Sequence, residues 1–223
     1  MICRSYRRPW PVGRTRPVRV IRYIYFKVAL LQETHLAEID ADRIKKMWVG
    51  VEYHSSLNPE SGGTSVLIHK SLTFQCVNSK KLTLGRIYNP NGGNSEFFKD
   101  IADILSNTTD IPVILGGDWN TVLDRHLDKS NYMRPSSQST IGQPSLLMNE
   151  LDLKDIWRQT CPKERDYTYF SRVYSFYSKL TFFLSSELIP AYLEAVIDNI
   201  LISDHAPVIL TMDAGYTSLK SYR

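Results

Sequence analysis

The chain has 223 residues, of which 43% are apolar and 22% charged, and its formal net charge is +4. This length suits one sizeable domain, and the composition is not that of a disordered chain. No run of 18 apolar residues occurs, and Arg and Pro interrupt the apolar runs near the N-terminus. We therefore expect neither a membrane span nor a signal peptide. Cys3, Cys76 and Cys161 are too scattered for a zinc site and indicate reduced thiols in an intracellular protein.

The first 32 residues carry eight of the 27 basic residues and no acidic one, which leaves 19 basic and 23 acidic residues elsewhere. Three prolines and a glycine interrupt the start of this segment, so residues 1–20 are predicted to be irregular. A basic arm on an acidic body suits contact with a phosphate backbone. It equally suits a solvated leader, and the sequence leaves both interpretations open.

Short strands and a few helices follow along the chain. Apolar spacing typical of a helix begins after Asn94-Ser95 and recurs over residues 146–153, where Ser145 is the predicted cap. Residues 125–144 between them are polar and loop-like. Strands interleaved with few helices indicate a single α/β sandwich domain. The strands are predicted at residues 26–31, 65–69, 72–77, 82–88, 111–115, 168–171, 179–184, 196–202 and 208–212.

Three polar clusters each follow one of the buried apolar runs, at residues 32–35, 116–120 and 203–207. Polar residues at strand ends collect along one rim of a sheet, the usual location of a site in such folds. Hard cations such as Mg²⁺ take oxygen ligands, and phosphodiester hydrolysis needs an activated water and charge neutralisation. The clusters supply three carboxylates, an amide and two imidazoles: Glu33, Asp118, Asp204, Asn120, His35 and His205.

Each cluster alone is weak evidence for a site. Asp-Trp-Asn most often forms a capped turn, and Asp-His before Pro is most often a hydrogen-bonded turn. His35 by itself is more often structural than catalytic. Three such clusters in this order, each at the end of an apolar strand, are together much more specific.

Seven segments carry a resemblance to a known family. They are Leu30-Leu31-Gln32-Glu33-Thr34-His35, 63–69, Tyr88-Asn89-Pro90-Asn91, 116–120, Leu127-Asp128-Lys129-Ser130, 167–171 and 203–207. In this order they resemble the endonuclease/exonuclease/phosphatase superfamily, and specifically the endonuclease domain of LINE-type retrotransposons. That branch is similar to the apurinic/apyrimidinic (AP) endonucleases, to exonuclease III and, more distantly, to deoxyribonuclease I.

The resemblance covers about residues 20–213, between an irregular leader at 1–19 and a tail at 214–223. It implies a two-sheet α/β sandwich of the deoxyribonuclease I type that nicks DNA with Mg²⁺, or with Mn²⁺ in its place. It also implies a monomer in the nucleus, without a membrane or a known protein partner.

Residue roles follow from the resemblance by position. Glu33 matches the metal-binding glutamate, and Asp204 matches a carboxylate near the metal. Asp118 matches the aspartate that activates or orients the attacking water. Asn120 matches its partner, which contacts the phosphate.

Four further positions match residues that contact the substrate. His205 matches the histidine that stabilises the phosphate or acts as acid–base residue, and Tyr88 matches a tyrosine on the phosphate. Thr168 and Ser203 match positions on the DNA-binding surface. For Tyr88 and Thr168, packing is a strong alternative, because aromatic and β-branched residues are common in any strand.

The chain departs from the family pattern in three places. The family carries an Asn on its first strand, whereas the first Asn of this chain is Asn58, so that strand is expected to be missing or replaced. The interval from Cys76 to Tyr88 is too short for the two strands and turn that the family places there. Thr181 stands where the family has the Asp that hydrogen-bonds the active-site histidine. Nothing in the sequence places Asp198 as a substitute.

These departures leave three functions open. The first is an active metal-dependent DNA endonuclease. The second is an impaired pseudoenzyme that at most binds nucleic acid. The third is a phosphatase or sphingomyelinase acting on inositol or lipid phosphates, against which the LINE-like segment 167–171 argues.

Overall fold

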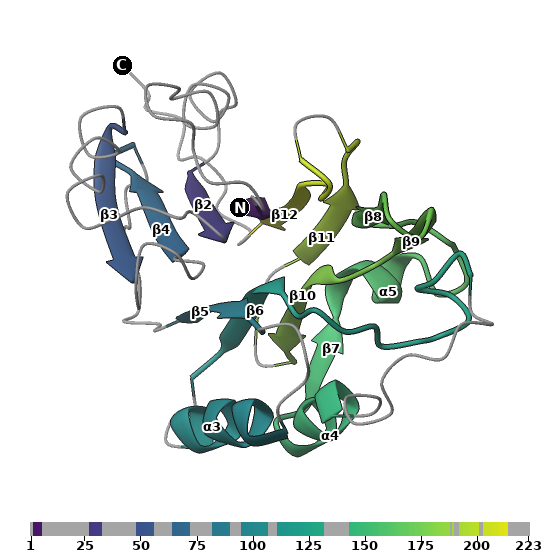
Figure 1. Cartoon of the computed structure of the whole chain (residues 1–223). Coiled ribbons are helices and arrows are strands. Elements are labelled where there is room, and N and C mark those ends of the chain that lie inside the picture. Colours follow the sequence, from purple (N-terminus) through teal and green to yellow (C-terminus); the bar gives the residue numbers. More distant parts are fainter. Residues whose placement is uncertain are drawn as a thin grey trace, which may run out of the picture.

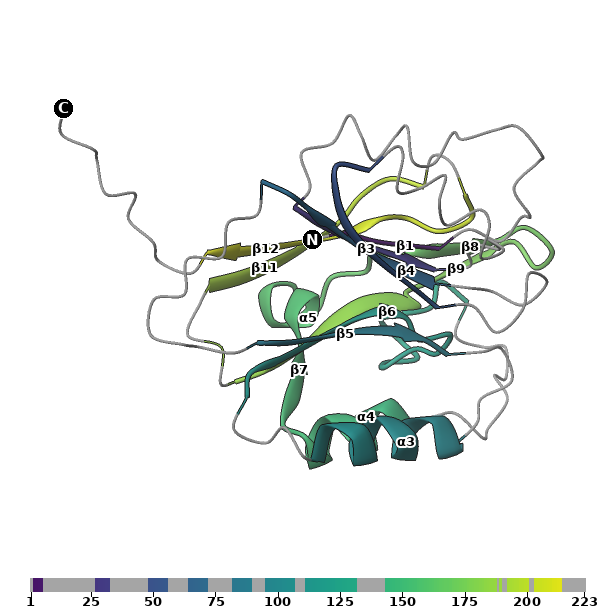
Figure 2. The same ribbon diagram turned by 90° about the vertical axis from the view of Figure 1, so that its left-hand side faces the viewer.

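The protein contains two β-sheets that pack face to face (Figures 1 and 2). The computed structural model describes residues 2–5, 27–32, 48–55, 64–71, 82–89, 95–106, 111–131, 143–187, 189, 192–200 and 203–213. Two helices cover the outer face of the second sheet, and a third lies between the layers (Figure 2). The helices are α3 (Ser95–Ser106), α4 (Gln143–Glu150) and α5 (Ile156–Thr160).

The first sheet has six strands. Its central strands, β1 and β2, run parallel, whereas every other neighbouring pair of strands in it is antiparallel. In spatial order the strands are β11 (Tyr192–Ile197), β12 (Val208–Asp213), β1 (Ile2–Ser5), β2 (Val28–Gln32), β4 (Thr64–His69) and β3 (Gly50–Ser55).

The second sheet has four strands, and a separate hairpin stands beside it. Among the described strands, β5 forms one edge of this sheet and β7 the other. In spatial order the sheet is β5 (Thr83–Tyr88), β6 (Val113–Asp118), β10 (Thr181–Ser186) and β7 (Leu153–Asp155), and the hairpin is β8 (Tyr169–Ser171) with β9 (Phe176–Ser178).

Strand β6 is buried on both faces, as its apolar run predicts. Val113 and Leu115 belong to the core under α3 and α4, whereas Ile114 belongs to the core between the sheets. Gly116 leaves room for the Phe183 ring of the neighbouring strand β10, because a Cβ at this position would lie 2.1 Å from that ring. The strand that leads to the second polar cluster is therefore fixed from both sides.

The predicted α/β sandwich is confirmed, and most of its predicted elements are present with shifted ends. Strands β2, β4, β5, β6, β8, β10 and β12 and helix α3 lie where the sequence pattern places them. The predicted strand at 72–77 lies outside the described residues. None of the described helices is long and apolar enough to cross a membrane.

The irregular structure predicted for the N-terminal segment is wrong at residues 2–5. These residues form β1, which pairs with β2 on one side and β12 on the other. A strand, β1, is therefore present near the start of the chain, where the sequence predicts that the family's first strand is missing or replaced. A four-residue strand between two others is held by backbone pairing, and a short-range pattern does not reveal it.

Two further predictions are shifted. Helix α4 begins at Gln143, so Ser145 lies inside it and is not its cap. Pro144 suits the first turn, where its missing N–H has no partner to lose. The helix ends before Asp152, whose φ is 47°. Strand β11 spans Tyr192–Ile197 and not residues 196–202.

Candidate active site

Tyr88, Asp118 and Thr181 lie side by side on three neighbouring strands. Asp118 at the end of β6 is the register partner of Tyr88 on β5 and of Thr181 on β10. The Trp119 side chain anchors the end of β6, because its Nε1 donates to the Phe182 carbonyl at 3.2 Å and its ring stacks on that of Phe182. Asp118 and Thr181 are buried and Tyr88 is half-buried.

His205 enters the same place from the turn before β12. Its Nδ1 lies 3.3 Å from Thr181 Oγ1, and its Nε2 lies 3.6 Å from Asp118 Oδ2. The turn is held by Ser203, whose hydroxyl accepts from the His205 backbone N–H and donates to the His205 carbonyl, both at 3.0 Å. The Tyr169 ring packs on the imidazole, with 4.8 Å between the ring centroids.

The Asp118–His205 pair can carry acid–base chemistry. A carboxylate accepts a proton, whereas an imidazole can donate a hydrogen bond to a phosphate oxygen. Thr181 supplies only a neutral hydroxyl to the imidazole. The contact between Thr181 and His205 was predicted from the family pattern, and the geometry places the two side chains together as expected.

Asp198 does not take over the role of the missing carboxylate at position 181. It lies at the surface, and its carboxylate accepts from the backbone N–H of Asn199 at 2.8 Å. Its own backbone N–H donates to the Pro207 carbonyl at 2.9 Å. Asp198 therefore fixes the backbone ahead of the His205 turn.

Asn120 follows Asp118 in a turn that holds the carboxylate. Its backbone N–H donates to Asp118 Oδ1 at 3.0 Å, and its φ is 48°, in the left-handed region. Its Nδ2 donates to the Asn89 carbonyl. The sequence motifs assigned no role to Asn89. The signals for it were its place directly after the strand that ends at Tyr88 and its membership of the segment Tyr88-Asn89-Pro90-Asn91.

Thr168 is not on the surface, contrary to the prediction that it contacts DNA. Its side chain is 0% exposed. Its hydroxyl accepts from the backbone N–H groups of Leu180 and Thr181, at 2.8 and 2.9 Å. Its carbonyl accepts from the Ala206 N–H at 2.8 Å. Thr168 therefore links the start of β10 to the His205 turn. This is a structural role, as the packing alternative for this residue predicts.

Of the two predicted metal ligands, Asp204 lies among the described residues and Glu33 does not. Glu33 lies outside the described residues, directly after the end of β2 at Gln32. Asp204 is half-buried in the His205 turn, and its carbonyl accepts from the Phe170 N–H at 2.9 Å. The described residues alone bring no three acidic, His or Cys side chains together. The donors at hand are carboxylate oxygens, which suit Mg²⁺, and Glu33 would have to complete the set.

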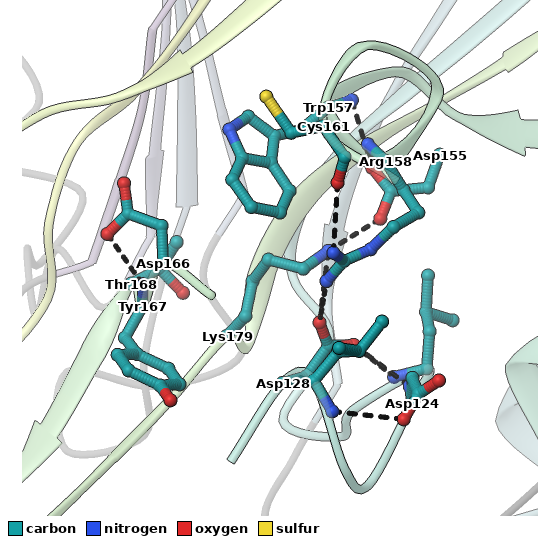
Figure 3. A network of polar contacts seen from close by, with 12 residues as sticks. Asp124, Asp128, Asp155, Trp157, Arg158, Cys161, Asp166, Tyr167, Thr168 and Lys179 are labelled. Carbon is teal, nitrogen blue, oxygen red and sulfur yellow. Dashed lines mark hydrogen bonds and ion pairs between the residues drawn. The ribbon is translucent and has the colours of Figure 1, made fainter. Parts of the chain in front are cut away.

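A buried charge network lies beside the site (Figure 3). Lys179, two residues before Thr181, is fully buried, and its Nζ donates to Asp155 Oδ2 at 2.5 Å. The same Nζ lies 3.8 Å from Asp128, which also pairs with Arg158 at 2.5 Å. Segment 127–130 carries part of the family resemblance, but its sequence does not predict this network, because long-range pairing leaves no local pattern.

The network joins the loop after Asn120 to the strand that carries Thr181. Asp128 Oδ2 accepts from the N–H groups of Leu123 and Asp124, and its carbonyl accepts from the Lys179 N–H. Lys129, next in the loop, forms a backbone bridge with Ser178. Burial, and then the Arg125 charge, lower the pKa of Lys129 below its ordinary value.

No family model matches the chain. The Transposon TX1 uncharacterized 149 kDa protein of Xenopus laevis is 25% identical over 184 residues, which cover 70% of this chain. The chain spans only 14% of the length of that protein. This similarity agrees with the transposon resemblance drawn from the motifs.

Solved structures share the fold. The AP endonuclease LMAP of Leishmania major has a TM-score of 0.72 at 15% identity, covering 95% of this chain and 86% of that one. An AP endonuclease of Archaeoglobus fulgidus has a TM-score of 0.70 at 13% identity, covering 96% and 99%. The 3′ phosphatase NExo from Neisseria, bound to a product DNA hairpin, has a TM-score of 0.73 at 15% identity, covering 96% and 99%. The resemblance predicted from the motifs is confirmed, and at these identities it concerns the fold.

Proposed function

We propose that this chain is a metal-dependent phosphodiesterase that nicks DNA and derives from a LINE-type retrotransposon. The observation that carries the proposal is that Tyr88, Asp118 and His205 meet at one end of the sandwich, with Asn120 in the adjoining turn. The fold shared with two AP endonucleases and with a phosphatase bound to DNA supports DNA as the substrate. On this proposal the chain acts as a monomer in the nucleus.

In the proposed reaction, Asp118 takes a proton from the attacking water. The water oxygen bonds to phosphorus as the bond from phosphorus to the leaving sugar oxygen breaks, the leaving oxygen takes a proton from solvent, and Asp118 later releases its own proton to solvent. His205 and the Tyr88 hydroxyl donate hydrogen bonds to phosphate oxygens, where negative charge develops. Asn120 holds the Asp118 carboxylate in position through its backbone N–H.

Glu33 and Asp204 are the side chains that would hold Mg²⁺ or Mn²⁺. Both supply hard oxygen donors, and the bound cation supplies charge that neutralises the phosphate. Ser203 contributes by fixing the turn that carries Asp204 and His205.

A second candidate, an impaired pseudoenzyme that at most binds nucleic acid, is favoured by one contact. The hydroxyl of Thr181 reaches His205 where the family pattern has a carboxylate. A hydroxyl hydrogen-bonds an imidazole but does not balance the charge of an imidazolium. We therefore propose that the active site is assembled but that the absence of a carboxylate at position 181 makes its turnover slow.

The test is a nicking assay on supercoiled plasmid and on an abasic-site duplex, with and without Mg²⁺, and with folding checked by circular dichroism. We expect slow nicking that requires Mg²⁺ and falls to background in Asp118→Ala. Absence of nicking by the folded chain, with Mn²⁺ also tried, would exclude the enzyme and leave the pseudoenzyme. Hydrolysis of an inositol phosphate without DNA nicking would favour the phosphatase alternative.

Lys129→Gln is expected to weaken DNA binding several-fold at low salt. Burial, and then the Arg125 charge, disfavour the charged form of Lys129, and a bound phosphate would offset that effect. Losing one phosphate contact lowers the slope of log K against log salt by about 0.9. Fluorescence anisotropy in an Asp118→Ala background measures binding without cleavage. The surface substitution Lys154→Gln is the matched control, and equal slopes for the two would contradict a phosphate contact at Lys129.

A further inference from the structure

Asn89 makes hydrogen bonds to three consecutive residues of the site. It is 1% exposed and directly follows β5. Its backbone N–H donates to the Asp118 carbonyl at 2.9 Å, and its Nδ2 donates to the Trp119 carbonyl at 2.9 Å. Its own carbonyl accepts from Asn120 Nδ2 at 2.5 Å. Asn89 thus spans the whole turn that carries the proposed base.

This turn needs to be held. Asn120 adopts a φ of 48°, which is uncommon for a residue other than glycine. In this conformation the Asn120 N–H reaches Asp118 Oδ1 at 3.0 Å, and the other carboxylate oxygen lies 3.6 Å from His205 Nε2. The shape of the turn therefore sets the direction of the Asp118 carboxylate.

Packing alone does not account for Asn89. Its Oδ1 is buried and has no hydrogen-bond partner among the described residues. A buried acceptor without a partner destabilises the folded state, and a hydrocarbon side chain of similar size would remove the Asn89 Oδ1 but would also take away the donor to the buried Trp119 carbonyl, so the two effects offset. An amide at this place therefore gives little net stability, and its one side-chain bond goes to the Trp119 carbonyl.

We propose that Asn89 is a positioning residue that acts through the Asp118–Asn120 turn. Its amide holds the Trp119 carbonyl, so that Asn120 stays in the left-handed conformation and Asp118 stays directed at the reacting water. The inference rests on the proposed phosphodiesterase function for its catalytic part. Its structural part, which is that Asn89 stabilises the hydrogen bond of the Asn120 N–H, does not depend on whether the chain is an active enzyme.

The test is Asn89→Leu, which keeps the approximate size and the backbone hydrogen bonds but removes the amide. We expect amide hydrogen exchange at Asn120, followed by NMR, to become about tenfold faster, because its bond to Asp118 weakens. We expect kcat for nicking to fall about tenfold while KM stays within about twofold, since the substrate contacts remain. The midpoint of thermal unfolding should move by less than about 3 °C.

Asn149→Leu on the exposed side of α4 is the control and should change none of these quantities. If Asn89→Leu does not fold, Asn89→Asp keeps the side-chain shape and removes the donor to Trp119, and the same exchange and kcat changes are expected. Unchanged Asn120 exchange in a folded variant would overturn the proposal, whether or not the chain nicks DNA. An inactive wild type would instead overturn the proposed function, and the exchange measurement would still decide the role of Asn89.

Discussion

Thr181→Asp is expected to raise the rate of DNA nicking roughly 10²-fold to 10⁴-fold. Thr181 Oγ1 lies 3.3 Å from His205 Nδ1, so an Asp side chain at this position reaches the same nitrogen. In a serine-protease triad, neutralising the carboxylate that orients the histidine reduces the rate by about 10⁴. The added carboxylate would fix the imidazole tautomer and stabilise its protonated form.

The same variant should change the pH dependence of nicking. A carboxylate beside the imidazole raises the pKa of His205 relative to the wild-type chain, because the opposite charge favours the protonated form. On the proposed mechanism, in which the protonated histidine donates to the phosphate, this form then persists to higher pH. The alkaline limb of the pH–rate profile is therefore expected to move to higher pH.

Thr181→Asn is the matched control, because Asn has the shape of Asp without its charge. Single-turnover nicking of an abasic-site duplex across a pH series, with Mg²⁺ held constant, separates the two variants. We expect the Asn variant to stay near the wild-type rate and profile. Equal rates for the Asp and Asn variants, with both folded, would show that the missing charge is not what limits turnover.

The sequence predicts the central strands and the residues at their ends for a common physical reason. A strand buried on both faces, such as β6, needs a continuous apolar run, and this run stands out from its surroundings. The polar residues that follow it lie at the rim of the sheet, which is how Asp118 and His205 could be placed together in advance. The contact between Thr181 and His205 was accessible only through the family pattern.

The elements that the sequence does not predict depend on partners far along the chain. Strand β1 has four residues and is held by pairing with β2 and β12, and β3 is an edge strand whose side chains are mostly exposed. The bond from Asn89 to Trp119 spans 30 positions. Thr168 was assigned to the surface by position in a motif, whereas three-dimensional packing places it in the interior.

Lys179→Met is expected to lower the free energy of unfolding by about 3–5 kcal/mol, which is the usual effect of removing one partner of a buried ion pair. Lys179 is fully buried, and its ammonium contacts Asp155 at 2.5 Å and Asp128 at 3.8 Å (Figure 3). It also lies 4.9 Å from the centre of the Phe182 ring. Without the Lys179 ammonium, two carboxylates, those of Asp128 and Asp155, remain buried, and the guanidinium of Arg158 is the positive charge left to balance them. A small domain is stable by about 5–15 kcal/mol, so this loss is a large fraction of the total.

Urea unfolding followed by circular dichroism measures this loss as a shift of the midpoint at constant slope. Lys154→Met is the matched control, because Lys154 pairs with Asp152 and Glu187 at the surface, where water screens the charges, and its midpoint should stay close to that of the wild type. Adding Asp155→Asn to Lys179→Met removes one of the stranded carboxylates and should recover part of the lost stability. The same midpoint for Lys179→Met and Lys154→Met would contradict the network as a source of stability. Because the network holds the segment that leads to Thr181, its loss would also be expected to loosen the contact between Thr181 and His205.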